Sequence, residues 1–310
     1  KYGNQTDSIT YYLNQPHRCK VFDYDLGQKD TLFSTMDSIR YMERFMHCGF
    51  VAIAPHTGEV KAWVGDINFQ SWKYDKVLSK RQPGSTFKLF VYTEAMNQGL
   101  SPCDLRVDEN IPWEVEENGE KKLWMPHNAN GGATLDTMSL KMAFAQSVNT
   151  IAANIAHEVG IHQIATTAHR MGIQTKLEET PALSLGASDV SLLELVSAYG
   201  TVVNDGEAIQ PILITRVENK DGKVIYQQEA EATQAIPYAS AYLMQQMLRG
   251  GLTCPKGTSQ ALWRFRIFDK GTEFGGKTGT SSNHSDAWFV GISPNLVGGA
   301  WVGGEYRSIH

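Results

Sequence analysis

The spacing of apolar positions changes along the chain and predicts a fold of mixed composition. Between residues 136 and 203, apolar side chains recur every three or four positions, the period of helices with one buried face. Toward both ends, apolar positions instead form short β-rich runs separated by turn residues. Strands that precede and follow a helical middle predict an α+β fold, with an antiparallel sheet built from both chain ends.

Individual elements follow from this pattern together with turn and stop signals. Helices are predicted over residues 36–46, 85–98, 136–146, 150–158, 161–171, 189–203 and 237–249. Hairpins are predicted over 50–66, around Asn118-Gly119 and over 212–226, with final strands in 274–282 and 286–304. Residues 1–33 are polar and irregular, which is typical of a linker, and a possible capping box at Ser34-Thr35-Met36-Asp37 opens the first helix.

Composition and charge narrow the class of protein. Of the 310 residues, 42% are apolar and 10% aromatic, as in globular proteins with a substantial core. No apolar run of about eighteen residues is present, and the first residues lack the apolar region of a signal peptide. A net charge of −5 without a dense basic stripe argues against nucleic acid as a partner.

The cysteines and histidines do not form a metal-binding pattern. The four cysteines are widely spaced and lack CxxC pairing, and the histidines form no HExxH motif. We therefore expect no zinc site and no cofactor, while free thiols and disulfides both remain open. The cysteines are Cys19, Cys48, Cys103 and Cys254.

The first candidate motif is RQPGSTFK. Ser85 and Lys88 lie three residues apart on a predicted helix, so their side chains share one face. If burial or a cationic neighbour lowers its pKa, a neutral Lys88 can accept the proton of the Ser85 hydroxyl. An oxyanion that forms at the helix start would be stabilised there. Taken alone, the pair is more typical of a helix cap beside an exposed lysine.

The second motif, Ser147-Val148-Asn149, lies between two predicted helices. A turn at this point can direct both polar side chains to one cleft. Ser147 can then relay a proton to a leaving amine, and Asn149 can hold a substrate amide or orient Lys88. Taken alone, serine and asparagine at a helix junction are most often caps.

The third motif, Lys277-Thr278-Gly279-Thr280, lies on a predicted strand. Its cation and hydroxyls suit a carboxylate. Gly279 would let an extended peptide approach the strand and pair with it as an added edge. Taken alone, the motif is more typical of a glycine bulge with polar residues facing solvent.

In this order, the three motifs together resemble the active-site set of the penicilloyl serine transferases. Ser147 follows Ser85 by 62 residues, and Lys277 follows Ser147 by 130. Longer segments are similar to the transpeptidase domain of class A, or bifunctional, penicillin-binding proteins, over about residues 33 to 305. These segments are FVAIAPHTGEVKAWVGD, RQPGSTFK, GGATLDTMSLKMAFAQSVNT, LSLGASDVSLLELVSAYGTVVNDG and KTGTSSNHSDAWFVGISP.

The resemblance implies a serine D,D-transpeptidase that cross-links peptidoglycan in the bacterial cell envelope, on the external face of the cytoplasmic membrane. The implied fold is an antiparallel sheet flanked by helices, with a mostly helical subdomain. The implied partners are stem peptides, as D-Ala-D-Ala donor and amine acceptor, and β-lactam antibiotics. The family also has a membrane anchor, a glycosyltransferase domain and a C-terminal helix. We therefore interpret residues 1–33 as an interdomain linker and 34–310 as a transpeptidase domain with an incomplete C-terminal end, held to the membrane by a segment outside this chain.

The resemblance also implies roles for single residues. Ser85 would be the nucleophile, Lys88 its base and Ser147 a proton shuttle, while Asn149 would position the peptide. The strand Lys277-Thr278-Gly279-Thr280 would bind the terminal carboxylate, and the backbone N–H groups of Ser85 and Thr280 would form the oxyanion hole. Outside the motifs, we expect three aromatic residues to line the cleft: Trp72, Tyr74 and Trp124.

Three related functions share these motifs. A serine β-lactamase needs a group that activates the deacylating water, and Glu178 or Glu179 are candidates. A D,D-carboxypeptidase differs only in using water as the acceptor. A β-lactam sensor domain, which is not an enzyme, would be acylated by the antibiotic and transfer nothing to an amine.

Overall fold

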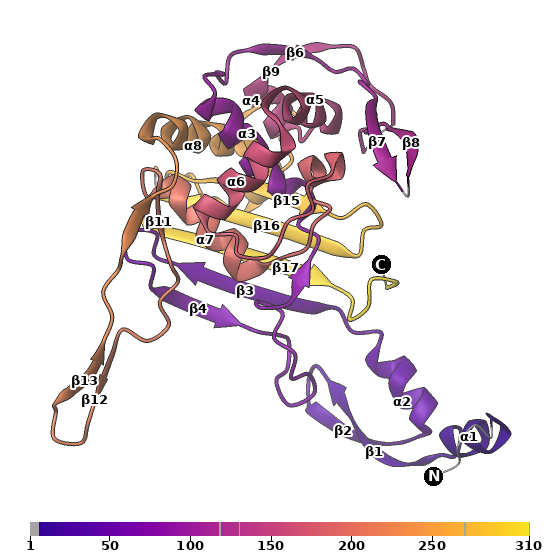
Figure 1. Cartoon of the computed structure of the whole chain (residues 1–310). Coiled ribbons are helices and arrows are strands. Elements are labelled where there is room, and N and C mark those ends of the chain that lie inside the picture. The colour runs from indigo at the N-terminus through magenta and orange to yellow at the C-terminus, as the bar shows by residue number, and fades with distance from the viewer. Residues whose placement is uncertain (1–5, 118, 130, 270, 310) are drawn as a thin grey trace.

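The computed structural model describes residues 6–117, 119–129, 131–269 and 271–309 and is organised around a five-stranded antiparallel sheet (Figure 1). The strand order is β15-β16-β17-β3-β4. β3 (His47–Ile53) and β4 (Val60–Val64) come from the first part of the chain. β15 (Gly275–Thr280), β16 (Asp286–Ser293) and β17 (Leu296–Gly303) come from its end. The predicted α+β fold, with a sheet built from both chain ends, is confirmed.

Helices cover one face of this sheet. α7 (Leu192–Val203) lies against β3, β16 and β17, and α8 (Tyr238–Thr253) lies against β15. Gly299 of β17 permits the close approach of α7, because a Cβ there would lie 2.3 Å from Val196 Cγ2. The apolar face of each helix therefore packs against the strand side chains that point toward it, which alternate along each strand. Together they form a continuous core.

The helical middle of the chain packs around one fully enclosed helix. α3 (Lys88–Asn97) is buried on all sides from Lys88 to Met96 and contacts α5, α6 and α8. The surrounding helices are α4 (Leu140–Ala145), α5 (Asn149–Val159) and α6 (Ile161–Met171). A helix that is enclosed in this way is normally apolar throughout. The lysine at its first position is therefore a costly exception that calls for an explanation.

The N-terminal segment is regular, so the prediction of an irregular stretch over residues 1–33 is wrong for its described part. It contains α1 (Thr6–Leu13) and the antiparallel hairpin β1 (His17–Asp23) and β2 (Gly27–Phe33). The hairpin buries fully only Val21 and Phe22, so its polar, exposed faces carry little apolar alternation. α2 (Thr35–Met42) begins at the predicted capping box but ends before residue 46, because β3 starts at His47.

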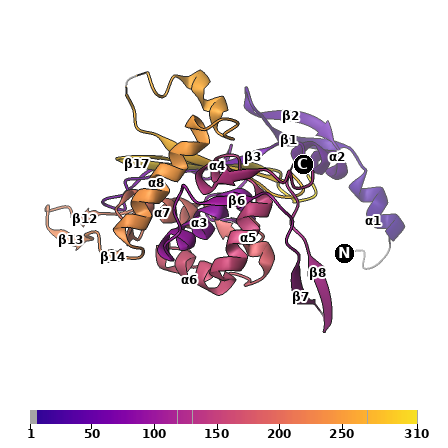
Figure 2. The ribbon, with the colours of Figure 1, turned by 90° about the horizontal axis from the view of Figure 1, so that it is seen from above.

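Short hairpins and paired strands extend from this body (Figures 1 and 2). The hairpins predicted over 50–66, around Asn118-Gly119 and over 212–226 are confirmed, the last two at residues 113–124 and 216–227. Asn118 itself lies outside the described residues. None of the helices in the described ranges is long and apolar enough to cross a membrane. The remaining strands are β5 (Lys80–Arg81), β6 (Leu105–Val107), β7 (Trp113–Glu117), β8 (Glu120–Trp124), β9 (Thr137–Ser139), β10 (Val190–Ser191), β11 (Glu207–Ile209), β12 (Arg216–Glu218), β13 (Val224–Gln227) and β14 (Ala232–Gln234).

Candidate active site

Ser85 lies in a short 3₁₀ turn, η1 (Gly84–Phe87), directly before α3. Pro83 occupies the N-cap position of this turn, and no side chain makes a capping hydrogen bond there. The alternative interpretation of Ser85 as a helix cap therefore does not hold. The Ser85 side chain is half-buried and has no hydrogen-bond partner among the described residues. Its hydroxyl is consequently free to react at the start of a helix, where unpaired N–H groups favour negative charge.

Three glycines hold the serine turn between a loop and the edge strand β15. Gly84 has a φ of +53°, and a Cβ on it would lie 2.3 Å from the backbone oxygen of Thr280. A Cβ on Gly186, which ends the 3₁₀ turn η2 (Pro181–Leu185), would lie 2.2 Å from the Gly84 oxygen. A Cβ on Gly279 would lie 2.4 Å from the Pro83 oxygen. The expectation that Gly279 opens the strand to substrate thus needs correction, because the serine turn fills that space.

Two buried side chains fix the backbone on both sides of the serine. Trp288 of β16 donates from Nε1 to the Gln82 oxygen at 2.8 Å. Tyr199 of α7 donates from its hydroxyl to the Thr86 oxygen, also at 2.8 Å. The sequence did not identify either residue as part of the site, because an aromatic residue in an apolar run is normally core.

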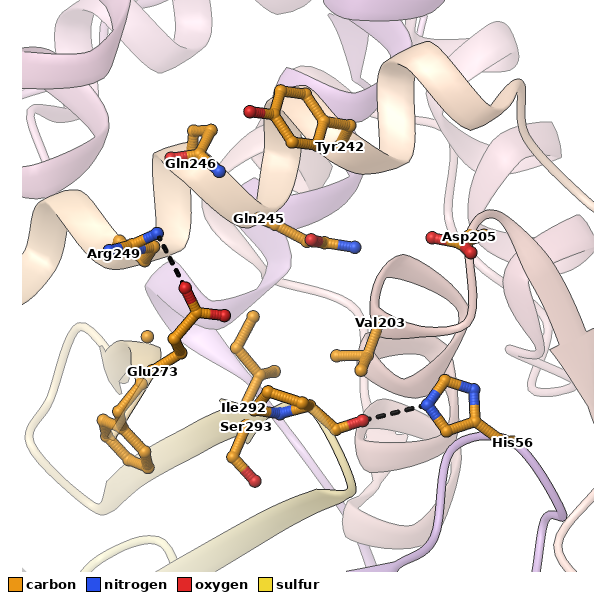
Figure 3. Close-up of a pocket in the computed structure, with 13 residues that line it drawn as sticks. His56, Val203, Asp205, Tyr242, Gln245, Gln246, Arg249, Glu273, Ile292 and Ser293 are labelled. Carbon is orange, nitrogen blue, oxygen red and sulfur yellow. Dashed lines mark hydrogen bonds and ion pairs between the residues drawn. The ribbon is translucent and has the colours of Figure 1, made fainter. Parts of the chain in front are cut away.

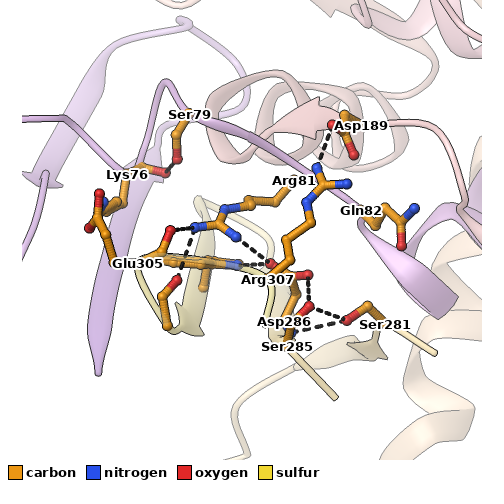
Figure 4. A network of polar contacts seen from close by, with 12 residues as sticks. Lys76, Ser79, Arg81, Gln82, Asp189, Ser281, Ser285, Asp286, Glu305 and Arg307 are labelled. Atoms are coloured by element: carbon orange, nitrogen blue, oxygen red, sulfur yellow. Dashed lines mark hydrogen bonds and ion pairs between the residues drawn. The ribbon is translucent and has the colours of Figure 1, made fainter. Parts of the chain in front are cut away.

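Arg81 ties the same segment to the C-terminal strand (Figure 4). Its Nη2 donates to the backbone oxygens of Gly304 at 2.9 Å and Glu305 at 2.7 Å. Its guanidinium lies over the ring of Trp301, 5.1 Å from the centroid. Asp286, fully buried beneath it, accepts from Trp301 Nε1 at 3.0 Å. The chain on which Ser85 stands is therefore anchored to the central sheet.

Lys88 is fully buried, and its amine points at the second motif. Nζ donates to the Ser147 backbone oxygen at 2.7 Å and to Asn149 Oδ1 at 2.6 Å, and lies 3.3 Å from Ser147 Oγ. Burial, and then the charge of Lys277, hold the pKa of Lys88 well below its usual range. A neutral amine has two N–H donors, and the two short contacts can use both. Its lone pair then remains available to accept a proton.

Lys277 is also buried and lies on the other side of Ser147. Its Nζ donates to Ser147 Oγ at 2.9 Å and to the Thr278 backbone oxygen at 2.9 Å. Burial lowers the pKa of Lys277 to about 7. The Ser147 hydroxyl is thus placed between two amines, and it stands on a left-handed backbone position with a φ of +60°. A strained conformation of this kind costs of the order of 1–3 kcal/mol.

Asn149, the first residue of α5, is held at both ends of its amide. Nδ2 donates to the His127 backbone oxygen at 2.8 Å, which leaves Oδ1 facing Lys88. Of the two roles expected for Asn149, these contacts serve the orientation of Lys88.

Thr278 contacts a residue that the sequence did not indicate. Its hydroxyl donates to Thr258 Oγ1 at 2.7 Å, and the backbone N–H of Thr258 donates to the Ala145 oxygen at 3.0 Å. Thr258 therefore connects the third motif to the helix that precedes the second. The Thr280 side chain is exposed, and among the strands of the described ranges β15 pairs with β16 alone. An extended ligand can therefore lie along this edge.

The three aromatic residues expected in the cleft lie elsewhere or make no contact with the motifs. The Trp72 ring packs on Phe22 at 5.0 Å and His47 at 4.9 Å, in a cluster beside the N-terminal hairpin. This placement corrects the prediction for Trp72. Tyr74 is exposed, and Trp124 packs on Trp113 at 6.0 Å. In the described ranges, no hydrogen bond or ring contact joins any of the three to a motif residue.

A cavity of about 410 Å³ lies outside this site, between α8, the end of α7 and the β16–β17 turn (Figure 3). Arg249 and Glu273 face each other across it at 3.7 Å, and His56 Nε2 donates to the Pro294 backbone oxygen at its far side. None of the motif residues lines this cavity. Nor do the described residues contain a group of three or more His, Cys, Asp or Glu that can hold a metal ion.

Comparison with known proteins agrees with the family that the sequence resembles. A family model for the penicillin binding protein transpeptidase domain matches residues 48–302, and one for the penicillin-binding protein middle domain matches residues 1–46. The chain is 32% identical over 262 residues to penicillin-binding protein 2D of Bacillus subtilis, which covers 84% of this chain and 37% of that protein. It is also 32% identical over 292 residues to penicillin-binding protein 1A of Vibrio cholerae, covering 84% and 35%.

The solved structures show the same relationship. Penicillin-binding protein 1A from Haemophilus influenzae superposes with a TM-score of 0.76 at 25% identity, over 85% of this chain and 44% of that chain. The chain thus spans about a third of the length of the curated relatives named above. The family match extends over most of the chain, including all three motifs and the sheet that carries them. The chain belongs to the penicillin-binding protein transpeptidase domain family.

Proposed function

We propose that the chain is a serine D,D-transpeptidase that cross-links peptidoglycan stem peptides through an acyl-enzyme on Ser85. The observation that carries this proposal is the placement of Ser147 between two buried amines, Lys88 at 3.3 Å and Lys277 at 2.9 Å. The arrangement provides a base for the nucleophile, a relay for the leaving group and a cation for a substrate carboxylate. The family match supports penicillin binding and transpeptidase chemistry.

In the acylation step, the Ser85 oxygen attacks the carbonyl carbon of the penultimate D-Ala. Lys88 takes the hydroxyl proton, and the backbone N–H groups of Ser85 and Thr280 stabilise the developing oxyanion. The C–N bond then breaks, and the proton passes through Ser147 to the departing D-Ala nitrogen. Lys277 holds the terminal carboxylate with Thr278 and Thr280, and the approach of that anion favours the protonated form of Lys277.

In the second step, an amine from a neighbouring stem peptide attacks the acyl-enzyme. The proton of the amine leaves by the same relay, the ester bond to Ser85 breaks and a new amide forms. A β-lactam follows the first step as a mimic of the donor. Its ring-opened product stays attached because the amine leaving group remains tethered.

The structure offers little support for a β-lactamase. Glu178 and Glu179 are exposed, and Glu179 pairs with His162 on the surface at 3.0 Å. In the described parts of the chain, neither carboxylate hydrogen-bonds to a motif residue. A water activated for hydrolysis would therefore lack the base that a rapid deacylation needs.

The setting of this activity is part of the same proposal. We infer that the whole protein acts in the cell envelope, on the external face of the cytoplasmic membrane, and that a segment outside this chain holds it there. We also infer that residues 1–33 join the domain 34–310 to another part of the protein, with no cofactor and no nucleic acid involved.

The decisive experiment combines acylation with transfer. Benzylpenicillin is expected to add one covalent adduct, mapped by mass spectrometry to Ser85, and Ser85→Ala should show none. A stem-peptide analogue ending in D-Ala-D-Ala should then release D-Ala and pass its acyl group to an added amine.

Each other outcome identifies a competing function. Adduct formation without transfer to the amine indicates a sensor, and release of the acyl group to water alone indicates a carboxypeptidase. Rapid turnover of benzylpenicillin indicates a β-lactamase. A folded wild-type protein that forms no adduct would overturn the assignment altogether.

A further inference from the structure

A buried polar cluster lies behind the second motif, outside all three motifs. At its centre is Asp108, which is only 1% exposed to solvent. Its carboxylate accepts from the Thr134 backbone N–H and hydroxyl, both at 2.9 Å, and from the hydroxyl of Thr150. It also accepts from Asn128 Nδ2, at 3.0 and 3.1 Å from its two oxygens. Both oxygens of this buried carboxylate thus have hydrogen-bond donors.

Asn128 connects this cluster to the start of α5. Val148 precedes the helix and has no side chain that can cap it. Asn128 Oδ1 instead accepts from the backbone N–H groups of Asn149 at 2.9 Å and Thr150 at 3.3 Å. A residue distant in sequence therefore supplies the cap that the first turn of a helix requires.

The neighbouring residue completes a second connection to the same place. The backbone oxygen of His127 accepts from Asn149 Nδ2 at 2.8 Å. Residues 127 and 128 therefore fix both the backbone and the side chain of Asn149. The Asn149 amide in turn places Oδ1 at 2.6 Å from the amine of Lys88.

We propose that Asn128 is a positioning residue of the candidate active site, which acts through Asn149 on the orientation of Lys88. The inference rests on the proposed function, since it assigns Lys88 as the base. The direction of the Asn128 amide is itself set by Asp108, which can only accept and therefore attracts Nδ2 and leaves Oδ1 for the helix. The Asp108–Asn128 pair thus determines which way the Lys88 lone pair points.

The hydrogen bonds also keep Asp108 ionised, which this arrangement requires. Burial by itself raises the pKa of the Asp108 carboxyl, but the hydrogen bonds from Thr150, Thr134 and Asn128 outweigh it and lower the pKa below the usual value. An ionised Asp108 accepts from all its neighbours and donates to none.

The test is to measure, for Asn128→Ala, the rate of the acylation step separately from the affinity of the complex that precedes it. Acylation by the chromogenic cephalosporin nitrocefin gives a first-order rate at saturation and a dissociation constant for the preceding complex. We expect the first-order rate to fall by about 10- to 100-fold, as for a misplacement near 1 Å, with the dissociation constant changed by less than about threefold.

Asn154→Ala is the matched control. Asn154 lies on the same helix α5 and donates to the Glu109 oxygen at 3.0 Å, beside Asp108, but contacts no motif residue. Asn154→Ala removes one bond between α5 and the same segment, whereas Asn128→Ala removes several, so we expect a smaller loss of thermal stability and unchanged acylation constants. Equal acylation rates in the two variants, or a change confined to the dissociation constant, would overturn the proposal.

Thr150 provides a second pair of variants in case Asn128→Ala fails to fold. Thr150→Val keeps the shape but removes the hydroxyl that donates to Asp108, and Thr150→Ser keeps the hydroxyl. We expect Thr150→Val to slow acylation and Thr150→Ser to acylate at a rate near that of wild type. Equal acylation rates in the two would contradict the inference. A wild-type protein that nitrocefin does not acylate at all would instead refute the proposed function.

Discussion

At the scale of single residues, two buried lysines lie in environments that fit the different roles expected for them. Both Lys88 and Lys277 are buried and both approach Ser147. The pKa of Lys88 is lowered by burial and also by its charged neighbour, whereas burial alone lowers that of Lys277 to about 7. Lys88, whose pKa both effects lower, is therefore favoured as the neutral base, and Lys277 can still carry a proton near pH 7.

The rate of acylation should accordingly pass through a maximum with pH. It rises as Lys88 loses its proton, and it falls above about pH 7 as Lys277 loses the charge that attracts a carboxylate. The measurement is the second-order rate of acylation by benzylpenicillin between about pH 5 and 9. With the methyl ester of benzylpenicillin, which lacks the carboxylate, the decline at high pH should be weaker. An identical decline with the ester would show that another group causes it.

The buried ammonium of Lys277 should also cost stability. The unfolded chain keeps the ordinary pKa of 10.5, so between about pH 7 and 10.5 it binds more protons than the folded state. The free energy of unfolding therefore rises with pH across this range. We expect Lys277→Met to be more stable than wild type by about 1–4 kcal/mol at pH 6 and to lose that advantage toward pH 10. Urea denaturation at both pH values measures the difference, and a gain independent of pH would exclude Lys277 as its source.

At the scale of elements, sequence pattern predicted those structures whose signal is local. The long apolar periods of α7 and α8 and the turn residues of the hairpin at residues 216–227 sufficed to locate them within a few residues. The hairpin of β1 and β2 escaped, because most of its side chains are polar and exposed.

The same distinction applies to the site. The three motifs give the reactive residues by type and spacing, and the structure brings Lys88, Ser147, Asn149 and Lys277 into contact. The contacts of Trp288 and Tyr199 with the serine turn, and of Thr258 with the third motif, depend on tertiary packing between distant segments. Neither composition nor periodicity carries that information.

The serine turn gives a prediction at this scale. Gly84→Ala combines a left-handed φ of +53° with a Cβ only 2.3 Å from the Thr280 oxygen, so β15 or the turn must move. We expect a loss of about 2–4 kcal/mol in the free energy of unfolding and at least about a 100-fold slower acylation of Ser85. Denaturation and nitrocefin acylation measure the two effects.

Gly222→Ala is the control for backbone strain alone. Its φ is +78°, but a Cβ would meet nothing within 4 Å. We expect a loss near 1 kcal/mol and unchanged acylation. If Gly84→Ala behaved like Gly222→Ala, the close approach of the turn to β15 would not matter for the reaction.

At the scale of the whole molecule, the sheet joins segments from both chain ends, and a buried charged cluster reinforces the joint. β17 pairs with β3, and beside this pair His47 Nδ1 lies 2.8 Å from Asp66. Lys76, which is 1% exposed along its side chain, pairs with Glu305 at 2.7 Å. The backbone oxygen of Glu305 also accepts from Arg81, the first residue of the RQPGSTFK segment. The cluster thus links the N-terminal strands, the C-terminal end and the segment that carries the nucleophile.

A double-mutant cycle on Lys76 and Glu305 tests the contribution of this cluster. Glu305→Gln leaves the buried ammonium of Lys76 without its closest anion, so we expect a loss of about 1–3 kcal/mol in the free energy of unfolding. Lys76→Met removes the ammonium, and in this background Glu305→Gln should cost much less, with a coupling energy of about 0.5–3 kcal/mol.

Because Arg81 binds backbone oxygens, and not the Glu305 carboxylate, the acylation rate of Glu305→Gln should stay within about twofold of wild type. Additive losses in the two variants would show that the pair is not coupled, and slow acylation at unchanged stability would place Glu305 in the active site instead.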